Sequence, residues 1–183
     1  DMEKFFSIEL RDLIKSNQVK SLLIWYAGHG KFINDVGYWI PVDAKRDDEF
    51  TYFNLNTLRA SMETYVNYLT HTLVVTDACE SGPSFYQAMR SDLKMKSCND
   101  YTATQMKSAQ VFSSAGYELA VDDSQFTRTF ANTLANNPKS CIPIEEIVVN
   151  VTKAVSNNNQ QKPKFGKITG LRDEDGTFFF IAK

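Results

Sequence analysis

The fold follows from two stretches of the sequence, SLLIWYAGHG (21–30) and TLVVTDACESG (72–82). Each is a short apolar run, rich in β-branched and aromatic residues, followed by a turn that contains glycine. Runs of this length and composition are typical of strands that are buried on both faces of a parallel sheet. His29 follows the first run and Cys79 follows the second. The sequence therefore predicts two core strands, each ending beside a reactive side chain.

The rest of the chain predicts helices and strands in alternation. Apolar residues recur at helical spacing over 2–16, where Asn17 marks the expected end, and again over 58–69. Polar composition predicts a loop at 83–108 and a linker at 156–164. Alternation of this kind predicts an α/β layered domain with a mostly parallel sheet. Further strands are expected at 37–43, 109–115 and 176–183, and further helices at 126–134 and from Pro143 to Val155.

The overall composition fits a single globular domain. The chain has 183 residues, of which 43% are hydrophobic. Its 20 basic and 22 acidic residues give a net charge of −2, so there is no basic excess to neutralise the phosphates of a nucleic acid. No apolar run approaches the ~20 residues of a membrane-spanning helix, and the charged, amphipathic start is unlike a signal peptide. We therefore expect no nucleic-acid partner and no membrane association.

The cysteine pattern favours free thiols. The three cysteines, at positions 79, 98 and 141, are an odd number, form no CxxC pair and are accompanied by only two histidines. A disulfide framework or a zinc site is therefore not expected, Cys98 and Cys141 are interpreted as inert, and a reducing, cytoplasmic location follows. Because position 1 is not methionine, the sequence is expected to be part of a longer protein.

His29 and Cys79 form a candidate catalytic pair. In an open parallel sheet the carboxyl ends of the strands lie at one edge, where functional groups assemble. A free thiol has a pKa of about 8.5, so a nearby imidazole is needed to accept its proton or to stabilise the thiolate. The backbone N–H groups of Gly30 and Cys79 are candidates for an oxyanion hole. Taken singly, a buried cysteine or a structural histidine is the commoner explanation; after two similar strands, the pair favours catalysis.

The same residues carry a resemblance to a known family. Similarity to the two signatures of the caspase and metacaspase cysteine peptidases (clan CD, family C14, bacterial-type caspase-like domains) is seen in YAGHG (26–30) and DACESG (77–82). The 50 residues between His29 and Cys79 agree with the spacing of the caspase histidine and cysteine. The resemblance implies a three-layer α/β/α fold with helices on both faces of the sheet. It also implies a cysteine endopeptidase that acts through a His29–Cys79 dyad and a thioester acyl-enzyme.

The resemblance extends over nearly the whole chain. The family's short hairpin resembles 37–44, and its last strand resembles 176–181. Its small-subunit strand, substrate-binding loop and following helix resemble 109–134. The implied organisation is a large-subunit-like part at 1–82, a processing-type loop at 83–108 and a small-subunit-like part at 109–183.

Two further expectations concern how such a chain is completed and processed. The family's sheet normally begins with two strands and a helix ahead of the segment that starts here. We expect these to come from an N-terminal segment or from a regulatory partner. Arg90, Lys94 and Lys96 in the predicted processing loop are either a solvated surface or a site of self-cleavage.

Asp77 is the expected determinant of substrate choice. It stands where the caspase signature has glutamine, and in metacaspases an aspartate there helps the primary pocket to accept Arg or Lys. A charge-assisted hydrogen bond is worth about 1.5–3 kcal/mol, enough to select a protein or peptide substrate with a basic residue at the cleavage site. The alternative is a carboxylate that caps a neighbouring helix or loop. The expected substrate-binding residues are Ala27, Asp77, Ser114, Ala115, Gly116 and Tyr117; the last four are expected to pair with the substrate backbone as an added strand.

No cofactor is expected. The acidic cluster that binds calcium in some metacaspases is not recognisable, no metal site is predicted, and His71 is interpreted as structural. Two other functions stay open: a partner-activated caspase-like protease with one dedicated protein substrate, and a catalytically silent binding scaffold. The intact pair of His29 and Cys79 speaks against the scaffold, because a scaffold needs neither residue.

Overall fold

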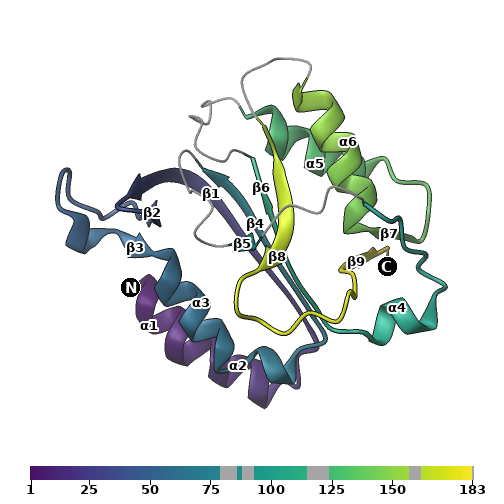
Figure 1. Cartoon of the computed structure of the whole chain (residues 1–183), viewed down its shortest axis with the longest axis horizontal. Coiled ribbons are helices and arrows are strands. Elements are labelled where there is room, and N and C mark those ends of the chain that lie inside the picture. Colours follow the sequence, from purple (N-terminus) through teal and green to yellow (C-terminus); the bar gives the residue numbers. More distant parts are fainter. Residues whose placement is uncertain (79–85, 88–92, 115–123, 157–161, 183) are drawn as a thin grey trace.

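A seven-stranded sheet forms the centre of the molecule (Figure 1). The three strands at its middle are parallel neighbours, in the order β1 (Ser21–Ile33), β4 (His71–Ala78) and β6 (Ser108–Ser113). The prediction of core strands in these regions is confirmed. The computed structural model describes residues 1–78, 86–87, 93–114, 124–156 and 162–182.

Antiparallel strands complete both sides of the sheet. β2 (Val36–Ile40) turns back along the end of β1, and β3 (Phe53–Asn54) pairs with β2. The two residues between β1 and β2, Asn34 and Asp35, have φ values of 49° and 63°. Positive φ at both positions is what a two-residue hairpin loop of type I′ requires, and Asn and Asp tolerate it. On the other side β8 (Lys164–Ile168) and β5 (Tyr86–Gln87) lie beyond β6.

The closing strand of the sheet is a correction to the sequence prediction. The stretch 176–183 was expected to close the sheet, but β9 (Phe179–Ile181) instead pairs with β7 (Cys141–Pro143) in a separate two-stranded ribbon. The position beside β6 belongs to β8, to which the sequence analysis assigned no strand. The reason is that β8 reads KFGKI, with two lysines and a glycine, and follows directly on a polar linker. The segment is a strand because it pairs with β6, which its composition does not indicate.

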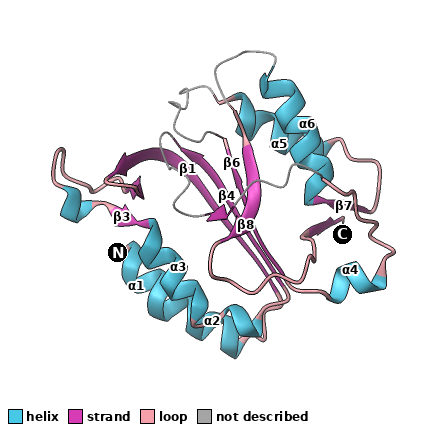
Figure 2. Ribbon diagram, viewed as in Figure 1, coloured by secondary structure: helices cyan, strands magenta, loops and turns pink. Residues whose placement is uncertain are grey.

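Helices cover both faces of the sheet, as the three-layer prediction requires (Figure 2). Helical structure runs without a break from Met2 to Ser16, with Asn17 as the cap that the sequence predicted. One face carries α1 (Met2–Lys4), the π-helical turn η1 (Phe5–Glu9), α2 (Leu10–Ser16) and α3 (Leu55–Glu63); the other carries α5 (Gln125–Ala135) and α6 (Ile144–Ser156). The short elements η2 (Glu49–Thr51), η3 (Val66–Tyr68) and α4 (Tyr101–Gln105) lie in the connections.

The helix expected over 58–69 is shorter than predicted. α3 begins after Asn54, whose side chain accepts a hydrogen bond from the Asn56 N–H at 2.8 Å, and it ends at Glu63. A 3₁₀ turn, η3, continues the chain toward β4. The predicted apolar face is nevertheless buried throughout, at Leu58, Met62, Tyr65, Val66 and Leu69.

Alternate residues of the central strands face two separate cores. In β4, Val74 belongs to the core under α2 and α3, and Val75 belongs to the core under α5 and α6. β1 was expected to be buried on both faces, but Leu23 and Trp25 are 40% and 37% exposed. The second core draws on β4 and β6 and not on β1, which α5 meets through Phe130, with its ring centroid 4.8 Å from that of Trp25. One face of β1 is therefore only partly covered.

His71 begins β4, at the far end of that strand from Cys79. Its ring is buried, and Nε2 donates a hydrogen bond to the Thr104 carbonyl at 2.8 Å. Nδ1 then accepts from the Ser108 hydroxyl at 3.1 Å. Burial lowers the pKa of His71 below its usual 6.5, and the bond to Thr104 opposes that shift in part. These contacts support the structural role that the sequence predicted.

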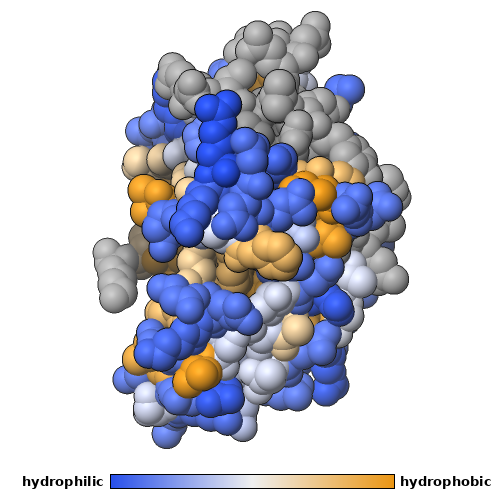
Figure 3. Space-filling model, turned by 90° about the vertical axis from the view of Figure 1, so that its left-hand side faces the viewer, coloured by the Kyte–Doolittle hydropathy of each residue, from blue (hydrophilic) through white to orange (hydrophobic). Residues whose placement is uncertain are grey.

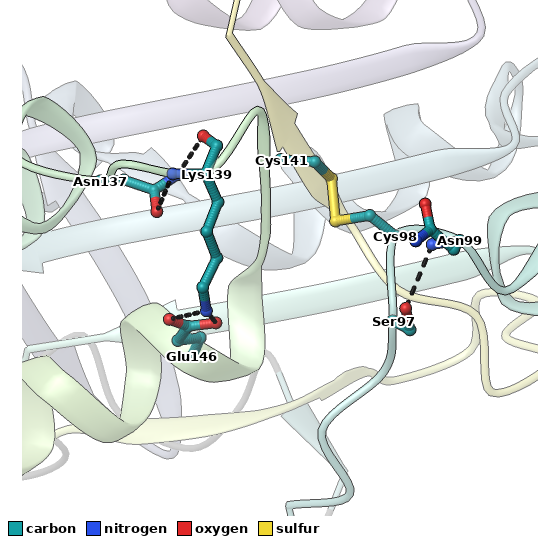
Figure 4. Close-up of a disulfide and its surroundings, with 7 residues drawn as sticks. All are labelled: Ser97, Cys98, Asn99, Asn137, Lys139, Cys141 and Glu146. Carbon is teal, nitrogen blue, oxygen red and sulfur yellow. Dashed lines mark hydrogen bonds and ion pairs between the residues drawn. A yellow bond between two sulfur atoms is a disulfide. The ribbon is translucent and has the colours of Figure 1, made fainter.

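A disulfide joins Cys98 to Cys141, with 6.2 Å between their Cα atoms (Figure 4). The prediction that both cysteines are inert free thiols is therefore wrong. The two lie 43 residues apart, with Cys141 at the start of β7, and local sequence does not reveal a contact between segments so far apart. Beside the bond, Lys139 forms an ion pair with Glu146 at 2.8 Å. The disulfide also removes the argument from cysteine content for a reducing, cytoplasmic location.

The predicted loop 83–108 contains more structure than its composition indicates. β5 and α4 both lie within it, and the disulfide ties its second half to β7. Of the three basic residues considered for self-cleavage, Lys94 is exposed, whereas Lys96 is half-buried and donates from Nζ to the Gly176 carbonyl at 3.4 Å. Arg90 lies outside the described residues, as does most of the linker at 156–164.

The surface mixes polar and apolar side chains. Figure 3 shows one face on which hydrophobic residues form separate groups among hydrophilic ones. Val42 and Phe50 are fully exposed. Within the described ranges, no helix combines the length and the apolar character needed to cross a membrane.

Candidate active site

The carboxyl ends of β1 and β4 lie side by side. The two strands pair in parallel, with Ala27 opposite Asp77 and Gly28 opposite Ala78. Neighbouring strands are about 4.8 Å apart. His29 is the next residue of β1, and its side chain is exposed. Cys79 follows Ala78 directly in the sequence and lies outside the described residues. The register thus brings the predicted base to the edge of the sheet where β4 ends.

The backbone at His29 is held by an aromatic pair that the sequence analysis did not single out. The Tyr26 hydroxyl donates to the His29 carbonyl at 2.7 Å and lies 3.1 Å from the Ile40 carbonyl. The Tyr26 ring stacks on Trp39, with centroids 4.3 Å apart and planes inclined by 9°. Trp39 is buried and donates from its indole nitrogen to Thr76 at 3.2 Å. A network of side chains therefore connects the histidine turn to β2 and to β4.

Glycine at position 28 is required by this arrangement. A Cβ at Gly28 would lie 2.9 Å from the Tyr26 hydroxyl, closer than side-chain carbons approach oxygen. A larger residue would displace the group that holds the His29 carbonyl. Gly30, the predicted oxyanion donor, stands opposite Trp39 in the hairpin. The motif YAGHG thus combines the candidate base with the tyrosine and the glycine that position it.

Asp77 sits in a row of residues across the three central strands. Ala27 of β1 is its register partner. On the other side Thr76 is opposite Ser113, and the Ser114 N–H donates to the Thr76 carbonyl at 2.9 Å, which places Ser114 next to Asp77. Register partners point to the same face of a sheet. Asp77 is 7% exposed and Ser114 is fully buried, so the carboxyl and hydroxyl groups of the row both lie below the protein surface.

Several polar atoms of this row and of the start of α5 lack hydrogen-bond partners. The Thr127 hydroxyl, on α5, donates to Asp77 Oδ2 at 2.5 Å. Within the described residues, Asp77 Oδ1 and the hydroxyl oxygens of Ser114 and Ser124 are buried and have no hydrogen-bond partner. Buried polar atoms nearly always have partners, so orphaned ones point to a ligand or to another part of the protein. The arrangement can therefore bind a group that donates hydrogen bonds.

Of the four residues predicted to pair with the substrate backbone, the structure describes only Ser114. The Ser114 amide is already bonded to Thr76, so this N–H is engaged within the sheet. Ala115, Gly116 and Tyr117 lie outside the described residues, and their expected pairing with a substrate strand stays a prediction. Thr127 was not predicted, because one threonine in an amphipathic helix carries no local signal of function.

Comparison with known families identifies the fold. The profile of the caspase domain, peptidase family C14, matches residues 5–171. The chain belongs to the caspase domain family. The match includes both strand ends described above and the position of Cys79, and the family indicates a cysteine peptidase in general terms. A search of curated proteins finds no match to this caspase domain.

Metal ligands do not gather in the described part of this caspase domain. Across residues 1–78, 86–87, 93–114, 124–156 and 162–182, no group of three or more His, Cys, Asp or Glu side chains is placed to hold a metal ion. The expectation that no cofactor is needed stays a prediction. The described site instead offers an exposed imidazole, a buried carboxylate and hydroxyl groups, which are suited to acid–base work and to cation binding.

Proposed function

We propose that this caspase domain is a cysteine endopeptidase that cleaves peptide bonds after Arg or Lys. Cys79 is the nucleophile and His29 is its base. The proposal is supported above all by the strand register, in which Gly28 of β1 is opposite Ala78 of β4, because His29 and Cys79 are the next residues in the sequence. Neighbouring positions of this kind are within reach of a hydrogen bond between thiol and imidazole.

The chemistry needs a proton carrier and an oxyanion site. His29 takes the thiol proton as the sulfur of Cys79 attacks the carbonyl carbon of the scissile bond. The N–H groups of Gly30 and Cys79 stabilise the negative oxygen of the tetrahedral intermediate. The carbon–nitrogen bond then breaks, the proton passes from His29 to the leaving amine, and a thioester remains. Water hydrolyses the thioester with His29 again as base, which returns the thiol and releases the new carboxyl end.

Selectivity for a basic residue is supported by the state of Asp77. Its carboxylate is buried, it stands two residues before the proposed nucleophile in the sequence, and Oδ1 has no hydrogen-bond partner within the described residues. A Lys or Arg side chain would satisfy that oxygen with a charge-assisted bond. An acidic side chain would meet like charge, and an apolar one would leave the carboxylate unpaired at a cost of several kcal/mol.

The test is cleavage of fluorogenic peptides that end in Arg, Lys or Asp, measured on the full chain. We expect turnover of the Arg and Lys peptides and none after Cys79→Ala. Asp77→Asn should lower kcat/KM for both by roughly 10- to 150-fold, because one charge-assisted bond is lost. Asp12→Asn, on the exposed surface of α2, is the matched control and should behave as wild type. Cleavage after Asp, or turnover by the Cys79→Ala variant, would contradict the proposal.

A further inference from the structure

Among the described residues, the side chain that hydrogen-bonds to Asp77 is that of Thr127. It lies in the first turn of α5, and its hydroxyl donates to Oδ2 at 2.5 Å. The contact joins α5 to the end of β4 across 50 residues of sequence. It divides the carboxylate into an occupied oxygen, Oδ2, and an unpartnered one, Oδ1.

We propose that Thr127 is a positioning residue that sets which oxygen of Asp77 meets the basic side chain of the substrate. The inference rests on the proposed function, because it concerns the same pocket. With Oδ2 held by Thr127, recognition of the substrate cation falls to Oδ1. The pocket is then built for one strong contact with a positive charge.

The geometry favours a fixed carboxylate. The terminal torsion of aspartate is broad, so an unrestrained carboxyl group samples many orientations. A β-branched threonine in a helix has few side-chain rotamers, so its hydroxyl is a fixed donor. The first turn of α5 is also the positive end of the helix dipole, which favours a carboxylate nearby. Thr127 therefore orients Asp77 at a small cost in conformational entropy.

Two further buried hydroxyl groups, on Ser114 and Ser124, lack hydrogen-bond partners among the described residues. Ser114 follows β6 in register with Asp77, is fully buried, and has an unpartnered Oγ within the described residues. Ser124 stands at the N-cap of α5, where serine usually accepts a bond from the helix, but its side chain makes no such bond. Its oxygen is buried and, among the described residues, also lacks a partner. Both can accept hydrogen bonds from an ammonium or guanidinium group.

The prediction concerns the ratio of lysine to arginine cleavage. Thr127→Val keeps the shape of the side chain, removes the hydroxyl and releases Oδ2. An ammonium group makes a point contact and depends on the fixed oxygen, whereas a guanidinium can bridge both oxygens and recover part of the loss. We expect kcat/KM for a Lys peptide to fall at least about 10-fold, from the loss of one charge-assisted arrangement. The value of kcat/KM for an Arg peptide should fall less. A third peptide, ending in citrulline as a neutral analogue of Arg, should keep its kcat/KM within about 2-fold of the wild-type value.

Thr127→Ser and Thr133→Val are the controls. Serine keeps the donor and should restore wild-type selectivity. Thr133 is on the same helix, and its hydroxyl donates to the Thr129 carbonyl at 2.8 Å, so its removal perturbs α5 without touching Asp77. An unchanged Lys value in Thr127→Val, or an equal loss on all three peptides, would overturn the inference, since the second result is what a merely structural role gives.

A binding measurement separates this inference from the proposed function. If the wild type cleaves none of the peptides, the endopeptidase proposal fails. The inference is then decided by binding of a labelled peptide ending in Lys to the Cys79→Ala variant, with and without Thr127→Val. Weaker binding in the double variant supports the role of Thr127. Equal binding in both, or no binding in either, overturns it.

Discussion

The disulfide between Cys98 and Cys141 makes a quantitative prediction about stability. Breaking the bond frees a loop of 43 residues in the unfolded chain. The chain-entropy relation for a loop of that length gives about 4 kcal/mol at 25 °C. A domain of this size loses about 2–4 °C of melting temperature for each kcal/mol, so the unfolding midpoint should fall by roughly 10 °C.

The assay compares the oxidised wild type with the variant Cys98→Ser/Cys141→Ser by thermal and urea unfolding. Wild type treated with a reductant should approach the variant, because both lack the same constraint. Cys79→Ala keeps the disulfide and should unfold with the oxidised wild type. The difference in free energy of unfolding is therefore assigned to the bond and not to the loss of a thiol.

A count of thiols tests the pairing directly. The sequence has three cysteines and the bond uses two, so denatured, unreduced protein should react with one equivalent of a thiol reagent. Cys79→Ala should react with none, and reduction should raise the wild-type count to three. Three reactive thiols without reductant, or equal midpoints for the oxidised wild type and the double serine variant, would refute the reasoning.

Three further predictions follow from single contacts. Tyr26→Phe removes the hydrogen bond to the His29 carbonyl, so the proposed base is less well positioned. We expect kcat to fall about 10-fold at nearly constant KM. An unchanged kcat in a variant whose circular dichroism spectrum matches that of the wild type would contradict this. His71 has a lowered pKa in the folded chain, so the unfolded chain takes up a proton first as the pH falls. The stability it contributes is complete above about pH 6.5 and is lost below it; melting curves from pH 7.5 to 5 should show a smaller loss in His71→Gln, and parallel losses would refute the assignment. Lys107 donates hydrogen bonds to the carbonyls of Val66, Asn67 and Leu69. Lys107→Met should therefore lower the free energy of unfolding by about 1–3 kcal/mol in urea titrations. Lys94→Met, at an exposed site, is the control and should lower it by less than about 0.5 kcal/mol.

The parts of this protein that the sequence predicted are those that depend on neighbouring residues. β4 and β6 are short apolar runs, and their burial follows from composition. β1 begins with such a run and forms the predicted strand, but one of its faces is only partly covered. The end of the first helix at Asn17 is marked by the loss of the apolar pattern. His29 and Asp77 could be singled out because each stands at the end of such a run, and the order of the strands then brings them to one edge. The composition and periodicity of single segments carry this information.

What only the tertiary structure decided depends on segments far apart in the chain. Cys98 meets Cys141 at the start of β7, and the sequence spacing alone gave no sign of it. The strand beside β6 is β8, whose lysines and glycine do not indicate a strand until its pairing with β6 is seen. Thr127 reaches Asp77 from α5, which packs against the core that contains Val75 of β4. In each case the partner is 40 or more residues away, and contacts at that distance are fixed by how helices and sheet pack together, which no local pattern of hydrophobicity records.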